Sequence, residues 1–129
     1  MTEHPNAATA RRCAEAWNSG RLDVFREYLS DDAVLHLAGD NAMSGTYRGR
    51  DGVMDAIARA SQGWGMHSEL EALLASDDHV IAFVRVTSER DGKTLDVVVA
   101  QAVKVNAEGK ATEAWFLPND QGGYDRFFL

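Results

Sequence analysis

The stretch Lys93–Val105, KTLDVVVAQAVKV, decides how the rest of the chain can fold. Three consecutive β-branched residues, Val97 to Val99, predict a central β-strand. Alternate side chains of a strand point to opposite faces. One face carries Leu95, Val97, Val99, Gln101, Val103 and Val105. We expect this face to line a core or pocket, and its single amide, Gln101, either meets a ligand there or bonds to the backbone inside the core.

The opposite face of the same strand has another character. Its residues are Asp96, Val98, Ala100, Ala102 and Lys104. Small apolar side chains between charged ends suit a surface that another subunit covers. We expect a homodimer formed through this outer face of the sheet.

Length and composition fit one domain, spanning residues 1–129. The chain is 45% hydrophobic and 26% charged, which argues against disorder. A net charge of −7 without a Lys/Arg block makes nucleic acid and anionic membranes poor partners. A small-molecule or protein partner is expected. Cys13 is the only cysteine, and neither a secretion signal nor an 18-residue apolar run is present, so we expect a cytoplasmic protein.

The other segments place helices before strands. Helical spacing predicts one helix after Pro5 that ends at Gly20, a short second helix that includes Leu22 and Phe25, and a third helix capped by Asp51. Strands are predicted at 33–38, 67–75, 79–90, 93–105 and 110–117, with a tight hairpin turn at Asp91-Gly92 and a loop at 39–50. Asp120 is a candidate cap for a last helical turn.

This order predicts the α+β class. We expect a curved, antiparallel or mixed sheet wrapped around the N-terminal helices as a cone-shaped half-barrel, a cystatin-like α+β roll. Such a hollow is a common place for a ligand.

Three phrases carry a resemblance to a known family. They are AWNSGRLDVFREYLSDDAVLHLAG (16–39), GTYRGRDGVMDAI (45–57) and GKATEAWF (109–116), the last followed by Asp120. In their order along the chain they resemble the nuclear-transport-factor-2-like superfamily, and within it the SnoaL-like and ketosteroid-isomerase-like bacterial proteins. The resemblance implies the cone-shaped fold and dimerisation through the outer sheet face. The scaffold hosts several activities, so it does not by itself imply one.

The activity signatures of two related groups are incomplete here. Ketosteroid isomerases carry a Tyr donor, an Asp base and a protonated Asp where this chain has Cys13, Leu37 and Gln101. Limonene-type epoxide hydrolases need carboxylates that Arg85-Val86-Thr87 and Trp115-Phe116-Leu117 lack. SnoaL-like cyclases, which use a carboxylate near the end of the last strand, resemble the chain better, and Asp120 lies near that position.

Three residues are candidates for catalysis. His36 is a candidate general base because an unperturbed imidazole titrates near neutrality; the alternative is a strand histidine bonded to the backbone. Asp120 is a candidate carboxylate base, with the helix cap as its alternative. Gln101 is a candidate donor to a developing enolate oxygen.

The candidate substrate-binding residues are mostly aromatic or apolar. They are Trp17, Tyr47, Trp64, Met66, Val99 and Trp115. Stacking of a flat ligand on the tryptophans and a hydrogen bond from Tyr47 are the functional interpretations, and packing explains each residue as well.

Other conspicuous residues have structural explanations. Cys13 is expected to be a small core residue, and Arg85 is expected to pair with Asp96 on the neighbouring hairpin strand. No set of metal ligands and no phosphate loop is found, so neither a metal nor a cofactor is expected.

The resemblance, together with these candidate residues, implies a small-molecule enzyme of the SnoaL-like type, a cofactor-independent cyclase or isomerase that acts on an apolar, polyketide-like or other carbonyl compound in an internal pocket. A pericyclase, whose pocket shapes the substrate without a base, is a variant of this prediction. The alternative is a non-catalytic ligand-binding or dimeric interaction module. Convergence of His36, Gln101 and Asp120 in one concavity would favour catalysis, and separation onto different faces would favour binding.

Overall fold

The computed structural model describes residues 3–63 and 65–128, and within them the backbone forms one mixed β-sheet with helices on one side. The six strands are β1 (Leu29–Leu37), β2 (Gly45–Arg48), β3 (His67–Ala75), β4 (His79–Arg90), β5 (Lys93–Val105) and β6 (Ala111–Pro118). Their order across the sheet is β2-β1-β6-β5-β4-β3. The β1–β6 pair is parallel and the other pairs are antiparallel. The predicted α+β class is confirmed.

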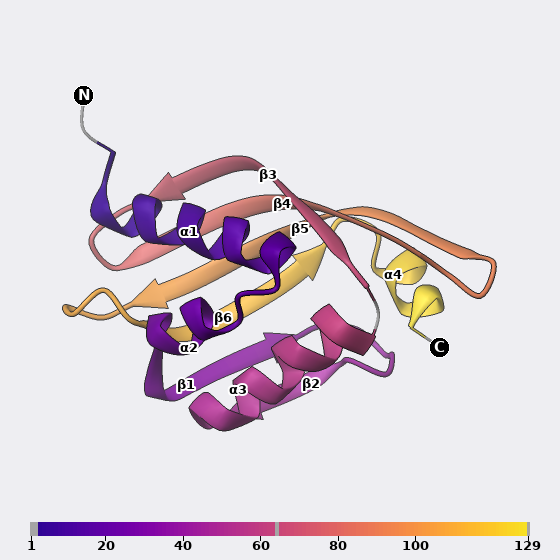
Figure 1. Ribbon diagram of the computed structural model, residues 1–129, viewed down its shortest axis with the longest axis horizontal. Coiled ribbons are helices and arrows are strands. Elements are labelled where there is room, and N and C mark those ends of the chain that lie inside the picture. Colours follow the sequence, from indigo (N-terminus) through magenta and orange to yellow (C-terminus); the bar gives the residue numbers. More distant parts are fainter. Residues whose placement is uncertain (1–2, 64, 129) are drawn as a thin grey trace.

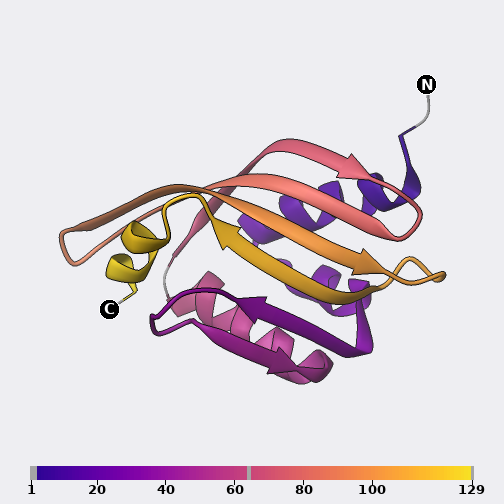
Figure 2. The same ribbon diagram turned by 180° about the vertical axis from the view of Figure 1, so that it is seen from behind.

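The helices leave one face of this sheet uncovered. Helices α1 (Pro5–Ser19), α2 (Asp23–Tyr28) and α3 (Gly49–Ala58) lie in front of the curved sheet in Figure 1, and a π-helical turn, η1 (Arg59–Gly63), extends α3. Helix α4 (Gln121–Phe127) follows β6 at one end of the sheet. Figure 2 shows the opposite side, where the strands lie in front of the helices. The inner face therefore meets helices, and the outer face does not.

Strand β5 has the two faces that its sequence predicts. Leu95, Val97 and Val99 are each at most 4% exposed, whereas Asp96 and Lys104 on the other face are exposed. The turn between β4 and β5 needs two residues with positive φ, and Asp91 (53°) and Gly92 (78°) supply them. This hairpin fixes the register of the two longest strands.

Hydrophobic residues on the inner face form two clusters. One gathers residues of β4 and β5 with Phe127, the last residue of α4, and Phe128, its C-cap. The other gathers Leu35 of β1 with Val53 and Ala56 of α3. Burial of these groups is the main force that holds the helices to the sheet.

Besides shifts of one residue at the ends of β1 and β6, three features differ from those predicted. The short strand β2 lies inside the predicted loop; four residues are too few to show an alternating pattern, and β2 pairs with β1 alone. Strand β1 begins at Leu29, four residues earlier than predicted, and its pairing with β6 is irregular between Leu29 and Val34. Asp51 lies in the first turn of α3 and does not cap it, because that helix begins at Gly49.

Candidate functional site: an internal pocket

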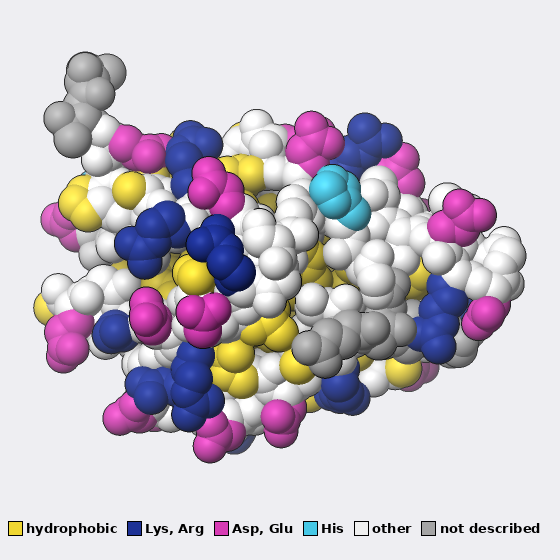
Figure 3. Space-filling view, viewed as in Figure 1, with side chains coloured by type: hydrophobic (Ala, Val, Ile, Leu, Met, Phe, Trp, Pro, Cys, Tyr) yellow, Lys and Arg dark blue, Asp and Glu magenta, His cyan; other side chains and the backbone are white. Residues whose placement is uncertain are grey.

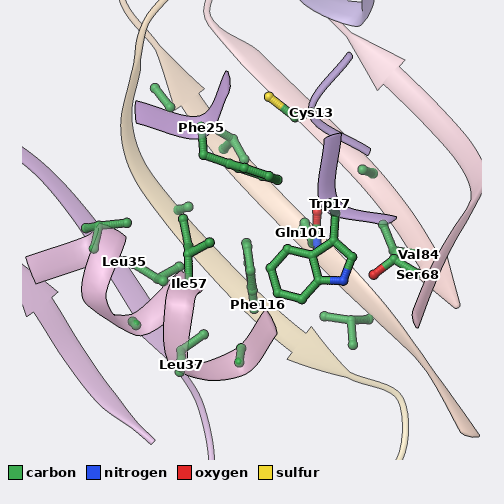
Figure 4. Close-up of a pocket in the computed structure, with 18 of the residues that line it drawn as sticks. Cys13, Trp17, Phe25, Leu35, Leu37, Ile57, Ser68, Val84, Gln101 and Phe116 are labelled. Carbon is green, nitrogen blue, oxygen red and sulfur yellow. The ribbon is translucent and has the colours of Figure 1, made fainter. Parts of the chain in front are cut away.

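A pocket of about 170 Å³ lies between the helices and the inner face of the sheet. Figure 4 shows Trp17 from α1, Phe25 from α2 and Ile57 from α3 pointing toward the strands that carry Gln101 and Phe116. In Figure 3, hydrophobic side chains gather at the centre of this side of the molecule, bordered by charged groups. A cavity of this size accommodates one or two small rings.

The wall of the pocket is mainly apolar. Aliphatic residues of five strands and two helices make most of it, including Leu35, Leu37, Val53, Val80, Val84, Val86, Val99 and Val103. Glu113 also borders the pocket, but its Oε2 is bonded to His36 on the outer face. None of the described lining residues is Lys or Arg. The site therefore favours an uncharged ligand with a large apolar surface.

Gln101 places a polar group on this wall. It pairs with Ala82 on β4 and Phe116 on β6 in the middle of the sheet, and it lines the pocket. No hydrogen bond links its side-chain amide to any residue that the structure describes. The amide can thus donate to, or accept from, a ligand. It is also the polar group that the alternation in β5 predicted to point inward.

Trp17 lines the pocket with its indole N–H already engaged. Its Nε1 donates to the backbone oxygen of Met66 at 2.9 Å. The ring is held edge-on to Phe25, with centroids 6.0 Å apart. Trp17 is therefore a fixed aromatic wall that also anchors the start of β3.

Two further groups lie at the α1–α2 side of the pocket. Tyr28 has a buried hydroxyl without a hydrogen-bond partner among the described residues. Burial raises the pKa of Tyr28 to about 12, and the nearby Cys13 adds to this rise. Burial also raises the pKa of the Cys13 thiol to about 11, so it is protonated near neutral pH and a poor nucleophile. Sequence patterns gave no signal for Tyr28, because its position depends on where α2 ends.

Four of the residues proposed from the sequence do meet in this pocket. They are Trp17, Met66, Val99 and Gln101. The structure brings them together from α1, the start of β3 and β5. Trp64, a fifth proposed residue, lies outside the described residues.

His36 lies on the opposite face of the sheet. Its neighbours in β1, Leu35 and Leu37, line the pocket, so strand alternation turns His36 outward. There it stacks on Trp115, with ring centroids 5.4 Å apart. Its Nε2 donates to Glu113 Oε2 (2.6 Å), and its Nδ1 lies 3.2 Å from the Thr46 hydroxyl.

Asp120 lies outside the internal pocket. It is the N-cap of α4, where its Oδ1 accepts from the backbone N–H of Gly123 at 2.9 Å. It borders a second, more open hollow beside the β4–β5 hairpin, with Lys93 and Arg126. That hollow has the larger volume, 490 Å³, because it is open to solvent. His36, Gln101 and Asp120 therefore do not converge.

Two of the proposed aromatic residues are also outside the pocket. Trp115 lies on the outer face beside His36. Tyr47, on β2, donates its hydroxyl proton to the backbone oxygen of Met43 at 2.7 Å and accepts from Arg59 at 3.0 Å. These two bonds hold Tyr47 as a packing residue at the β2–α3 junction.

The outer face carries two rows of mostly apolar side chains in register, and the longer row crosses five strands. One row runs Leu74–Ile81–Ala102–Trp115–His36, and a second runs Phe83–Ala100–Leu117. Leu74 is 63% exposed and Leu117 is 52% exposed. Beside these rows the predicted pair is confirmed, since Arg85 contacts Asp96 through two bonds of 2.9 and 2.7 Å. We name the residues of the two rows the outer patch.

No helix within residues 3–63 and 65–128 has the length and apolar character needed to cross a membrane. Among the same residues, no three His, Cys, Asp or Glu side chains are grouped as a metal would require.

The chain is similar to a known domain family and to several solved structures. The model of the SnoaL-like domain matches residues 10–114. Bal32a, from a soil-derived mobile gene cassette, is 30% identical, with a TM-score of 0.90 and 96% of each chain covered. No curated protein sequence matches.

Two less similar structures are of proteins linked to small molecules. IdmH of Streptomyces antibioticus, described as a candidate polyketide cyclase, is 24% identical over 91% of this chain and 94% of its own, with a TM-score of 0.73. RV0760c of Mycobacterium tuberculosis, solved in complex with estradiol-17beta-hemisuccinate, is 16% identical over 88% of this chain and 93% of its own, with a TM-score of 0.76. At these identities, both establish a shared fold and no shared activity.

Proposed function

The chain belongs to the SnoaL-like domain family, and from this premise we propose that it binds a compact, largely apolar carbonyl compound in the internal pocket, with the ligand oxygen at Gln101. The observation that carries this proposal is the Gln101 side chain. It is a polar group without a described partner on an apolar wall, and such a group gains a hydrogen bond when a ligand oxygen arrives.

Aromatic and aliphatic walls would supply most of the binding energy. Burial of apolar ligand surface is worth about 25 cal/mol per Å². Trp17 is already held by Met66, so little side-chain freedom is lost when a flat ring packs against it. The complex of RV0760c with estradiol-17beta-hemisuccinate shows that a protein of this fold can hold a polycyclic ligand.

Cyclisation or isomerisation of the bound compound is the second candidate function. It is favoured by the family and by the Gln101 amide, which can stabilise negative charge that develops on a carbonyl oxygen. Since His36 and Asp120 lie elsewhere, this reaction would depend on confinement of the substrate in a reactive shape and on hydrogen-bond donors. A pericyclic or other base-free ring closure fits that description, and we assign the reaction to this cofactor-independent class.

We also propose that two copies of the chain associate through the outer patch. Its exposed Leu74, Ile81, Phe83 and Leu117 have no helix above them. At its margins, cationic Arg85 lies beside Asp96, and Lys104 pairs in register with Glu113. A patch that carries both signs of charge can meet its own copy across a two-fold axis.

Binding of 1-tetralone, a bicyclic ketone of suitable size, tests the proposed pocket. Isothermal titration is expected to show one site on the wild-type chain, and Gln101→Leu is expected to weaken it roughly 3–10-fold through loss of one hydrogen bond. The matched control Thr46→Val removes a polar group on the outer face and should leave the affinity unchanged. Equal affinity of wild type and Gln101→Leu, or no binding at all, would contradict the proposal.

A further inference from the structure

The Tyr28 hydroxyl is a polar group that the fold leaves unused. Its oxygen is buried and has no hydrogen-bond partner among the residues that the structure describes, yet the residue lines the pocket. Buried polar groups are nearly always paired, because an unmade hydrogen bond is expensive. Tyr47, which lies outside the pocket, follows this rule through Met43. An exception on a pocket wall points to a partner that enters from outside the protein.

Tyr28 and Gln101 lie toward different ends of the pocket. Tyr28 directly precedes Leu29, which pairs with Ala111 at the start of β6. Gln101 pairs with Phe116, five positions further along the same strand, or about 16 Å at the usual rise. Tyr28 is close to Cys13, whereas Figure 4 shows Gln101 behind Trp17, one turn further along α1. One ligand can therefore meet the two groups at separate atoms.

The residues at the Tyr28 end of the pocket limit which ligand group can bind there. With its pKa raised to about 12, Tyr28 stays protonated near neutral pH and can donate a hydrogen bond. The neighbouring Cys13 thiol is likewise uncharged. The described lining residues include no Lys or Arg to balance an anion. A neutral oxygen, such as a carbonyl, hydroxyl or ether, fits better than a carboxylate or phosphate.

We propose that Tyr28 is a second ligand-binding donor and that the ligand is a compact apolar molecule with two oxygen functions, one at Gln101 and one at Tyr28. The inference rests on the proposed function, because it assumes that the pocket holds a ligand. It narrows the ligand class from apolar carbonyl compounds to those with a second neutral oxygen at the end of the molecule that reaches Tyr28. Tyr28 then selects among ligands of equal size.

Titration with a matched series of probes tests this selection. The probes are tetralin, 1-tetralone and the 5-, 6- and 7-hydroxy derivatives of 1-tetralone, which carry no, one and two oxygens. For the wild-type chain, at least one hydroxy derivative should bind roughly 3–10-fold more tightly than 1-tetralone. In Tyr28→Phe this gain should disappear, while the affinities for tetralin and 1-tetralone stay within about twofold of wild type.

Three controls separate the outcomes. Tyr47→Phe makes the same chemical change outside the pocket and should keep the gain. Thermal unfolding should show Tyr28→Phe at least as stable as wild type, because an unpaired hydroxyl is removed, and Tyr47→Phe less stable. Gln101→Leu should weaken the binding of 1-tetralone, but the added hydroxyl group should still increase the affinity as it does in the wild type.

Each contrary result has a distinct meaning. If wild type binds 1-tetralone but no hydroxy derivative binds more tightly, or if Tyr28→Phe keeps the gain, the role of Tyr28 is overturned and the proposed function stands. Equal weakening of tetralin and the ketones in Tyr28→Phe would also overturn it, since that pattern reports lost packing. If no probe binds wild type, the proposed function itself fails.

Discussion

The inner and outer faces of one sheet differ in how their polar groups are satisfied. In the pocket on the inner side, the Gln101 amide of β5 and the Tyr28 hydroxyl of α2 have no partner among the described residues, and both are uncharged. On the outer face, His36 bonds to Glu113 and Arg85 bonds to Asp96. Side chains one position apart on a strand thus belong to separate chemical environments. The unpaired hydrogen-bonding groups lie in the pocket, where a ligand can bind. The charged groups lie on the outer face, where they can contact solvent or a second subunit.

The two faces also differ in what they contribute to stability. The pairs on the outer face are partly exposed, with 47% of the Arg85 side chain and 50% of the Asp96 side chain accessible, and such pairs contribute little. Buried Val and Leu residues of β4 and β5 make the larger contribution. Stability therefore depends mainly on the inner face, whereas association is expected to depend on the outer face.

Truncation of an inner-face leucine should give the largest effect. Leu95 is 2% exposed, so Leu95→Ala is expected to lower the free energy of unfolding by about 3 kcal/mol through lost burial and a cavity. Urea denaturation followed by circular dichroism measures this. Leu74→Ala, at a site 63% exposed on the outer patch, should cost about 0.5 kcal/mol. Similar losses at the two sites would remove the contrast between the faces.

The second-largest effect is expected when charge is placed on the outer patch, which should weaken dimerisation without changing ligand affinity. Phe83→Glu with Leu117→Glu adds like charges to neighbouring positions of one row, since Phe83 and Leu117 both flank Ala100. Dimer affinity should fall at least about 100-fold, or 2.7 kcal/mol. Light scattering across a concentration series measures the mass, and 1-tetralone affinity should be unchanged. A wild-type chain that stays monomeric at high concentration would refute the proposed dimer.

Acidification is expected to have a smaller effect on the free energy of unfolding, through Asp125, which lies at the end of the sheet and outside both faces. Asn41 and Gln121 donate to Asp125 Oδ1 at 2.6 and 2.9 Å, and the Asn41 bond is the main cause of the lowered pKa of Asp125. A lowered folded-state pKa means that the ionised form favours folding. This contribution is complete above the ordinary aspartate pKa and is lost as pH falls through the lowered value.

Asp125→Asn should therefore flatten the fall in stability below about pH 4. Urea midpoints measured from pH 7 to pH 2.5 would show this change. Asp55→Asn, which removes an exposed carboxylate on α3, is the control and should leave the acid side of the profile unchanged. An unaltered profile in Asp125→Asn would show that these bonds do not persist in solution.

Much of the fold was predictable because its signals are local. The alternation in β5 and the Asp91-Gly92 turn fixed the strands, their faces and their register. Gln101 could be placed in the pocket for the same reason. The sequence allowed Asp120 to be either a carboxylate base or a helix cap, and its hydrogen bond from the Gly123 N–H identifies it as the cap of α4.

The rest of the site depends on contacts distant in sequence. His36 was expected to be a base only if it faced inward, and Ala33, Leu35 and Leu37 now occupy the inner side of β1. Their greater hydrophobicity compared with Val34, His36 and Ala38 was the available signal for that orientation. Tyr28 had no such signal, because its unpaired hydroxyl arises from where α2, α1 and β6 meet.

Two-dimensional NMR with 1-tetralone tests the central claim most directly, because it maps where the ligand sits on the folded chain. The account predicts saturable shifts of the Gln101 side-chain amide, the Trp17 indole N–H and the Val84 and Val99 methyl groups. Signals of His36 and Trp115 should stay in place. Shifts confined to His36, Trp115 and the rest of the outer patch would contradict the account, as would a spectrum that does not change.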